Sequence, residues 1–133
     1  MKLTSRSEYA LLALLYLARR NDHGFVTVDT IAKAQAIPPK FLEQILLTLK
    51  RSRYVRSSKG HGGGYALAMA PEKINLAEII RLFDGALAPT ESVSKYFYEP
   101  TPIEKEQKLI KLFRGIRDTI SDLLEETTLA DMR

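Results

Sequence analysis

The pattern of hydrophobic and polar positions predicts a chain built mainly of helices. Residues 9–18 are apolar almost all round, which predicts a first helix buried at the centre of the fold. Ser5 and Glu8 stand three residues apart ahead of this run, which is the spacing of a capping box at a helix start. Residues 21–24 read Asn-Asp-His-Gly and predict the turn that ends this helix.

Two further helices are predicted close together after that turn. Thr27 is expected to cap a short helix over residues 28–35, with Asp29 in its positive first turn. Because proline is tolerated in a first helical turn, a third helix is expected to begin at residue 38 or 39 and to run to about residue 49. Its predicted buried stripe is Phe41, Leu42, Ile45, Leu46 and Leu49. Its other side carries Lys40, Glu43, Gln44, Leu47 and Arg51.

Two short helices joined by a tight turn, the second with a polar face, are typical of a helix-turn-helix that reads DNA. An ordinary helical hairpin gives the same pattern. The next segment favours DNA binding, because residues 53–57 and 65–67 read as two strands around a basic, glycine-rich loop. Helices followed by such a hairpin are in the order of a winged helix. Glycines in the loop would let the backbone approach a polyanion closely.

The second half of the chain predicts one short and one long helix. Residues 76–83 form the short one, with Asn75 and Glu78 again at capping-box spacing, and residues 86–102 read as irregular. A long helix is expected over residues 103–126, about 36 Å in length. A coiled-coil-like seam along it predicts packing against a second subunit; the alternative is packing on the chain's own first helix. The seam consists of Leu109, Phe113, Ile116, Ile120 and Leu123.

The predicted fold is therefore mainly α with a small β-hairpin wing: a winged helix-turn-helix followed by a long C-terminal dimerisation helix. We expect a DNA-binding domain over residues 1–85, a linker or sensory loop over residues 86–102, and the dimerisation helix with its tail over residues 103–133. An aromatic cluster in and after the linker either lines a small apolar pocket or belongs to the core. It consists of Tyr96, Phe97, Tyr98 and Phe113.

The charge of the chain is unevenly distributed. The net charge is +4, but residues 1–65 hold eleven basic against four acidic side chains, whereas residues 66–133 hold nine against twelve. A basic first half suggests contact with a polyanion, although uneven solvated charge is the alternative. The longest apolar stretch is too short to cross a bilayer and the first residues do not resemble a signal peptide, so a cytoplasmic protein is expected.

The absence of cysteine excludes disulfides, thiolate-held zinc, cysteine-ligated iron–sulfur clusters and thiol catalysis. An enzyme is not expected. Residues 59–64 superficially resemble a phosphate-binding loop, but they lack the Gly-Lys-Ser/Thr ending and do not open a helix. No catalytic triad or acid pair is apparent. The other alternative is an interaction module that has lost DNA binding, which the basic first half and the intact hairpin argue against.

The chain resembles the Rrf2-type transcription regulators over essentially its whole length. This resemblance implies a homodimer with winged helices at its two ends, long C-terminal helices crossing between them, and a palindromic operator in double-stranded DNA. The motifs that carry the resemblance are Leu3-Thr4, Tyr9-Ala10-Leu11, Ile37, Phe41-Leu42-Glu43-Gln44-Ile45, Leu49, Val55-Arg56-Ser57, Lys59-Gly60-His61-Gly62-Gly63-Gly64-Tyr65, Ile79-Ile80-Arg81, Asp84-Gly85, Leu87-Ala88-Pro89, Ile116-Arg117-Asp118 and Thr127-Thr128-Leu129-Ala130-Asp131.

One departure from the family pattern bears on the cofactor. Many members hold an iron–sulfur cluster with three cysteines after Leu-Ala-Pro, but here Ser92 stands at the first position and residues 100–107 span the others. Glu8 matches an acid that some members use as a ligand; without thiolates it is interpreted as a helix-start anion. The resemblance thus implies a branch without a cluster or other cofactor, which senses a ligand or a partner protein. Repression is the commoner outcome in the family.

The candidate DNA contacts lie on three elements, and no metal site is expected. Hydroxyls and a cation at the start of the first helix suit a phosphate, although Thr4 and Ser5 are alternatively only caps. Gln44 suits an adenine edge and Glu43 a cytosine amine, whereas Lys40 is alternatively a solvated charge. His61 is expected to contact DNA rather than a metal, because the only other histidine is His23. The full set is Thr4, Ser5, Arg6, Tyr9, Pro39, Lys40, Glu43, Gln44, Arg51, Ser57, Ser58, Lys59, Gly60, His61, Gly62 and Gly63, with Arg56 as added charge.

Overall fold

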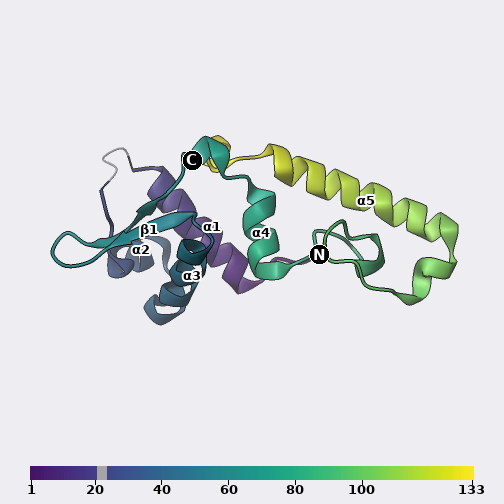
Figure 1. Cartoon of the computed structure of the whole chain (residues 1–133), viewed down its shortest axis with the longest axis horizontal. Coiled ribbons are helices and arrows are strands. Elements are labelled where there is room, and N and C mark those ends of the chain that lie inside the picture. The colour runs from purple at the N-terminus through teal and green to yellow at the C-terminus, as the bar shows by residue number, and fades with distance from the viewer. Residues whose placement is uncertain (21–23) are drawn as a thin grey trace.

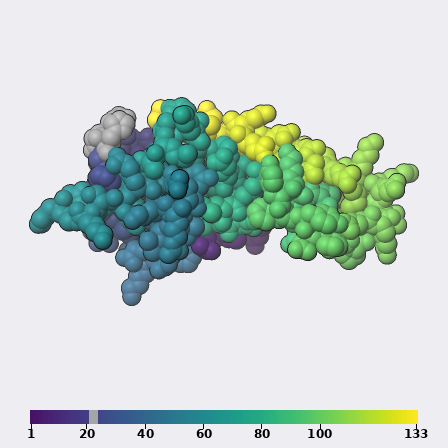
Figure 2. All heavy atoms as spheres, in the orientation of Figure 1, coloured from purple at the N-terminus to yellow at the C-terminus, as the bar shows by residue number. Residues whose placement is uncertain are grey.

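The computed structural model describes residues 1–20 and 24–133 of the chain. The molecule is elongated, with a β-hairpin projecting at one end and a long helix with the segment before it forming the other (Figures 1 and 2). The predicted turn at residues 21–24 lies outside the described residues except for Gly24.

Helices dominate the described part of the chain, and a single two-stranded antiparallel sheet accompanies them there, which confirms the predicted fold class. The strands β1 (Val55–Ser58) and β2 (Gly64–Leu67) pair with Val55 opposite Leu67. Three 3₁₀ turns are η1 (Pro71–Lys73), η2 (Glu91–Val93) and η3 (Pro102–Lys105). The α-helices are α1 (Ser5–Ala18), α2 (Val28–Gln35), α3 (Pro39–Arg51), α4 (Leu76–Asp84), α5 (Gln107–Glu126) and α6 (Leu129–Met132).

Side-chain caps start the helices largely as the sequence predicts. The Thr27 hydroxyl accepts the N–H of Thr30 at 3.2 Å, and the Asn75 carbonyl oxygen accepts the N–H of Glu78 at 2.9 Å. The capping box predicted at Ser5 is wrong by one residue, because Thr4 is the N-cap of α1 and its hydroxyl oxygen accepts the N–H of Ser7 at 3.4 Å. Thr4 and Ser5 both carry hydroxyls, so the local pattern did not distinguish them.

The main core forms around α1, which packs against α2, α3, α4 and α6. The stripe of α3 is buried as predicted at residues 42, 45, 46 and 49. Phe41 is the exception: it is 41% exposed, and its ring meets that of Tyr9 edge-on at 5.5 Å between centroids. It lies on the flank of α3 beside α1 rather than on the buried side.

The long helix is shorter than predicted and has its own packing partners. Pro102 opens η3 and Glu106 is extended, so α5 begins at Gln107 instead of near residue 103. It packs against α4, η2 and η3 rather than principally against α1. A minor core of Ala88, Val93 and Ile110, with Phe113 beside it, fills this second end of the molecule. Across residues 1–20 and 24–133 no helix is long and apolar enough to cross a membrane.

The C-terminal tail returns to the main core. Thr128 and Asp131 form a reciprocal capping box at the start of α6, and the Leu129 N–H donates to the Ile74 carbonyl at 3.0 Å. Leu129 is fully buried in the cluster that contains α1. The end of the chain therefore contributes to the same core as the helix-turn-helix.

This packing predicts that Leu129→Ala destabilises the fold by about 2–5 kcal/mol, as expected for removing a fully buried leucine and leaving a cavity. Met132→Ala is the matched control, because Met132 lies on the same short helix and is exposed. Urea unfolding followed by circular dichroism measures both. Equal, small effects of the two variants would contradict the assignment of α6 to the core.

Candidate nucleic-acid interface

The turn between α2 and α3 fixes how α3 is presented. Ala36 ends α2 in the left-handed conformation with φ 54°, and the Ile37 N–H donates to the Ala32 carbonyl at 2.9 Å. Ile37 is itself buried, so the turn is anchored to the core. Pro39 then begins α3 without a side-chain cap, which leaves the first N–H groups of the helix without a capping side chain.

The surface of α3 opposite its buried stripe is called the outer face here. Its members all lie exposed: they are Lys40, Glu43, Gln44, Leu47 and Arg51. All of them except Leu47 are predicted DNA contacts. Pro39 is exposed at the helix start. In the view of Figure 1, α3 lies between the hairpin and the N-terminal end of α1. The structure thus brings together the three elements on which the sequence placed its candidate contacts.

The hairpin, or wing, holds its shape through two of its glycines. A Cβ on Gly64, where φ is 138°, would lie 2.2 Å from the Val26 carbonyl oxygen, because Val26 and Tyr65 exchange two backbone hydrogen bonds of 2.8 Å. A Cβ on Gly63 would lie 2.5 Å from the Ser58 carbonyl oxygen. These glycines are required by the close approach of the protein's own backbone.

The tip of the wing is open. Gly60 and Gly62 have φ values of 85° and 73°, and a Cβ on either would meet nothing within 4 Å. Lys59 and His61 alternate with them and are exposed. Ser58 at the end of β1 is also exposed, whereas Ser57 is half-buried. The tip is therefore the part of the wing that can approach another molecule closely.

The base of the wing is tied to the domain by side chains. The Tyr54 hydroxyl donates to Glu78 of α4 at 3.0 Å, and burial together with this hydrogen bond raises the pKa of Tyr54 to about 12. Arg56 places its guanidinium 4.7 Å from the ring centroid of Phe25. Arg56 is thus partly occupied as a packing residue, although it still adds charge near the wing.

The first turn of α1 differs from the site that the sequence predicted. The Thr4 hydroxyl donates to Asp84 at the end of α4, and so does the hydroxyl of Ser7. Arg6 lies over the Phe83 ring, with its guanidinium carbon 5.3 Å from the centroid. A carboxylate therefore lies where hydroxyls and N–H groups were expected to await a phosphate. Asp84 is 80 residues from Thr4, so no local pattern could have indicated this contact.

In the segment where the family resemblance would place cluster cysteines, hydroxyl groups form hydrogen bonds with one another instead. Thr101 donates a hydrogen bond to the buried Ser92 and accepts one from Thr90 at 3.3 Å. Arg117 of α5 donates to the Val93 carbonyl at 2.7 Å. Alcohols and a guanidinium do not replace thiolates as cluster ligands, so these residues do not fit the cofactor. Among the described residues no group of three histidines, cysteines or acids could hold a metal ion; His23 lies outside them.

The aromatic residues of the linker do not form the pocket considered from the sequence. Tyr96, Phe97 and Tyr98 are exposed, whereas Phe113 packs against the minor core. Arg81 stacks over Tyr96 at 4.8 Å, and the Tyr98 hydroxyl donates to Glu104, which raises the pKa of Tyr98. The three consecutive aromatic side chains therefore lie on the surface and do not surround one cavity.

The fold and this interface define a winged helix-turn-helix DNA-binding protein. The sequence pattern of the Rrf2 family, which is described as "Iron-dependent Transcriptional regulator", matches residues 3–133. The chain therefore belongs to this family of transcriptional regulators. A protein of Mycobacterium tuberculosis is 37% identical over 135 residues, which cover 99% of this chain and 81% of the relative. The HTH-type transcriptional regulator CymR of Bacillus subtilis is 30% identical over 132 residues, covering 99% and 89%.

Solved structures that this chain resembles carry the same regulator names as its relatives in sequence. The structure of CymR, titled the global cysteine regulator of B. subtilis, has a TM-score of 0.85 at 28% identity and covers 99% of this chain and 95% of that one. The structure titled T. potens IscR has a TM-score of 0.75 at 27% identity, covering 99% and 85%. The expectation of a non-enzymatic transcription regulator is thereby confirmed. The family description names iron, but this chain has no cysteine that could hold an iron–sulfur cluster.

The wing geometry predicts a difference between two Gly→Ala substitutions. Gly64→Ala places a methyl group against the backbone of Val26, so we expect loss of the Val26–Tyr65 pairing, a stability loss of a few kcal/mol and weaker DNA binding. Gly60→Ala meets open space and costs only the strain of its positive φ, about 1 kcal/mol. Urea unfolding and gel-shift titration compare them. The prediction fails if the two variants are equally stable.

Proposed function

We propose that this regulator binds a palindromic operator as a homodimer, reads bases with the outer face of α3, and grips the flanking backbone with the tip of the wing. The observation that carries the proposal is the exposure of Lys40, Glu43, Gln44 and Arg51 on one side of a helix whose opposite side is fully buried. A recognition helix needs such a division, because one side must be anchored while the other enters the major groove.

Each contact has a specific chemical role in this proposal. Gln44 pairs with an adenine edge, and Glu43 accepts from a cytosine amine, which adds selectivity rather than affinity because a carboxylate repels phosphates. Lys59 and His61 approach the backbone from the wing, where Gly60 and Gly62 leave room. Arg6 and Tyr9 approach it from α1. Pro39, Lys40 and Arg51 complete the helix contact, and Ser5, Ser57, Ser58 and Gly63 border it.

The dimer is proposed to form through α5. An apolar strip on this helix is not covered by the chain itself: Leu112 is 56% and Leu123 64% exposed, and Leu109 and Ile116 are also exposed. A groove around Gly115, bordered by Leu112 and Ile116, lies within the strip. A Cβ on Gly115 would meet nothing within 4 Å, so the rest of this chain gives no reason for a glycine that weakens a helix. Of the predicted seam, Phe113 packs inward and Ile120 is half-buried.

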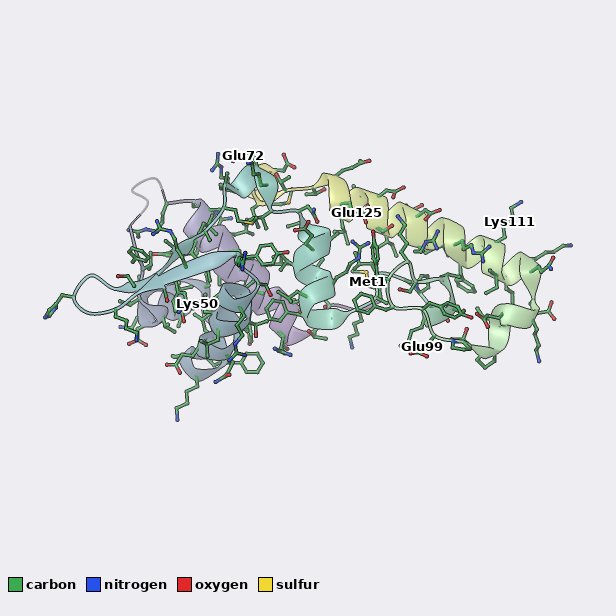
Figure 3. The ribbon with its side chains drawn as sticks, in the orientation of Figure 1. Met1, Lys50, Glu72, Glu99, Lys111 and Glu125 are labelled. Atoms are coloured by element: carbon green, nitrogen blue, oxygen red, sulfur yellow. The ribbon has the colours of Figure 1, made fainter. Side chains whose placement is uncertain are left out.

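The charges on α5 favour a second copy of the same helix running in the opposite direction. Its first half carries Lys108, Lys111 and Arg114 without an acid, and Lys111 projects away from the chain (Figure 3). Its second half carries Asp118, Asp122, Glu125 and Glu126 against Arg117. Of these acids, Asp118, Asp122 and Glu125 also form ion pairs within the chain, with Arg117, Lys95 and Arg81. Two antiparallel copies would place the basic half of one beside the acidic half of the other. A two-fold pair of winged helices would then read a two-fold DNA site.

The signal is proposed to be a small ligand or a protein partner rather than an iron–sulfur cluster, because the hydroxyls of Ser92 and Thr101 bond each other where thiolates would be needed. Repression in the cytoplasm is the proposed outcome. A dimer seated on an operator within a promoter blocks polymerase without further chemistry.

Selection of bound duplexes from a random pool tests the base readout, and an enriched palindrome is expected. On that operator, Gln44→Ala should cost about 1–3 kcal/mol and relax selectivity at one base pair per half-site. Lys59→Ala should weaken binding to all sequences alike and lower the salt slope by about one for each phosphate that is no longer neutralised. A pool without enrichment at moderate salt contradicts the proposal, as does weaker binding of Lys59→Ala to one operator only.

The dimer predicts the effect of Leu123→Lys. Since Leu123 is exposed in the single chain, the substitution should leave the subunit folded but bury a charge at the pair, so the dimer dissociates and full-operator affinity falls by at least tenfold. Met132→Lys is the control, an exposed apolar residue away from α5. Analytical ultracentrifugation measures the state. If the variant formed a dimer as tight as that of the unsubstituted protein, this face of α5 would be excluded as the dimer interface.

A further inference from the structure

Asp84, the last residue of α4, holds the first turn of α1. Its carboxylate accepts the N–H of Thr4 at 3.3 Å, the hydroxyl of Thr4, and the hydroxyl of Ser7 at 2.5 Å. Ser7 is fully buried. These contacts among Thr4, Ser7 and Asp84 are called the Asp84 clasp here. They join two helices that lie far apart in the sequence.

The clasp does by tertiary contact what a capping box does locally. In a capping box, an acid three residues after the cap binds the N–H of the cap residue. That position is Ser7 here, which has no carboxylate, and Asp84 supplies one from α4. The negative charge also faces the positive end of α1, and hydrogen bonds to an ionised acceptor are about twice as strong as neutral ones. The clasp therefore sets where α1 begins and how its first turn is oriented.

The same end of α4 also positions a cation. Phe83, next to Asp84, supplies the ring over which Arg6 lies. One turn further along α1, the ring of Tyr9 contacts Phe41 of α3. Arg6 is thus held against α4 and Tyr9 against α3, and both belong to the proposed phosphate contacts.

The other side of α4 is fastened to α5. Arg81 forms a 2.8 Å ion pair with Glu125 and stacks over Tyr96 of the linker. Ala77 and Ile80 form an apolar cluster that Leu124 of α5 joins. Helix α4 therefore lies between α1 and α5 (Figure 1), and Glu125 lies near the end of α5 that meets it (Figure 3).

We propose that Asp84 is a positioning residue for DNA binding: the clasp holds the first turn of α1, and with it Arg6, at the DNA backbone in a position fixed by the α4–α5 pair. Asp84 acts through Arg6 and does not itself contact DNA, because its charge would repel a phosphate. This inference rests on the proposed phosphate contact of Arg6.

The test measures how operator affinity depends on salt for Asp84→Ala, Arg6→Ala and the double variant. If one phosphate per subunit of a dimer is no longer neutralised, the ratio of affinities at 50 and 200 mM salt shrinks by about tenfold. Each single variant should show this reduction, and the double variant should show no more than Arg6→Ala alone. Glu72→Gln is the charge-matched control, since its described ion pair is with Arg133 at 3.3 Å, beside the C-terminal end of α1 rather than its first turn.

Amide exchange at Ser7 and Glu8 in the free protein reports on the clasp without DNA, and Asp84→Ala should accelerate it. Should Asp84→Ala not fold, Asp84→Asn, which keeps one accepting oxygen, takes its place with a smaller effect in the same direction. If Asp84→Ala lowers only the melting temperature and leaves the salt slope unchanged while Arg6→Ala reduces it, the clasp is merely structural and the inference is wrong. If Arg6→Ala leaves the slope unchanged, the phosphate contact in the proposed function is wrong, and the positioning role falls with it.

Discussion

Helix α1 is apolar on almost every side, and the fold covers most of it; among its leucines Leu12 is the exposed exception, at 36%. Ala10 and Ala13 are fully buried and small, which lets the surrounding helices approach closely, while Leu14 and Leu17 fill the space between them. Helices α2, α3, α4 and α6 are all held by this one element. The position of α3 therefore depends on the burial of α1, and so does the position of the chain's C-terminal end.

The division of α3 into a buried and an exposed side follows from that burial. Leu42, Ile45 and Leu46 are drawn against the core, so the polar residues at the intervening positions must face outwards. The wing depends on a second constraint, the close contact of Val26 with Tyr65, which only glycine at position 64 allows. Rigid anchoring on one side and free polar groups on the other are together what base readout requires.

Features set by neighbours in the sequence could be predicted, and features set by distant residues could not. The caps at Thr27 and Asn75 follow local rules, as does the stripe of α3, because each depends on residues at most a few positions apart. The ring contact of Phe41 is made with Tyr9 of another helix. The choice of Thr4 over Ser5 as cap depends on Asp84, and the burial of Leu129 depends on a core whose other buried members lie 50 or more residues earlier in the chain. None of these leaves a periodic trace in the sequence.

The linker, like the core, is held by contacts between residues that are not close neighbours in the sequence. It is held by the hydrogen bond between Thr101 and Ser92 and by the bond from Arg117 to the Val93 carbonyl. These contacts contain no thiolate that could hold a redox-active cluster. Arg81 joins Tyr96 of the linker to Glu125 of α5 and lies on the same helix as Asp84. Helix α4 thus connects the linker and α5 on one side with the first turn of α1 on the other.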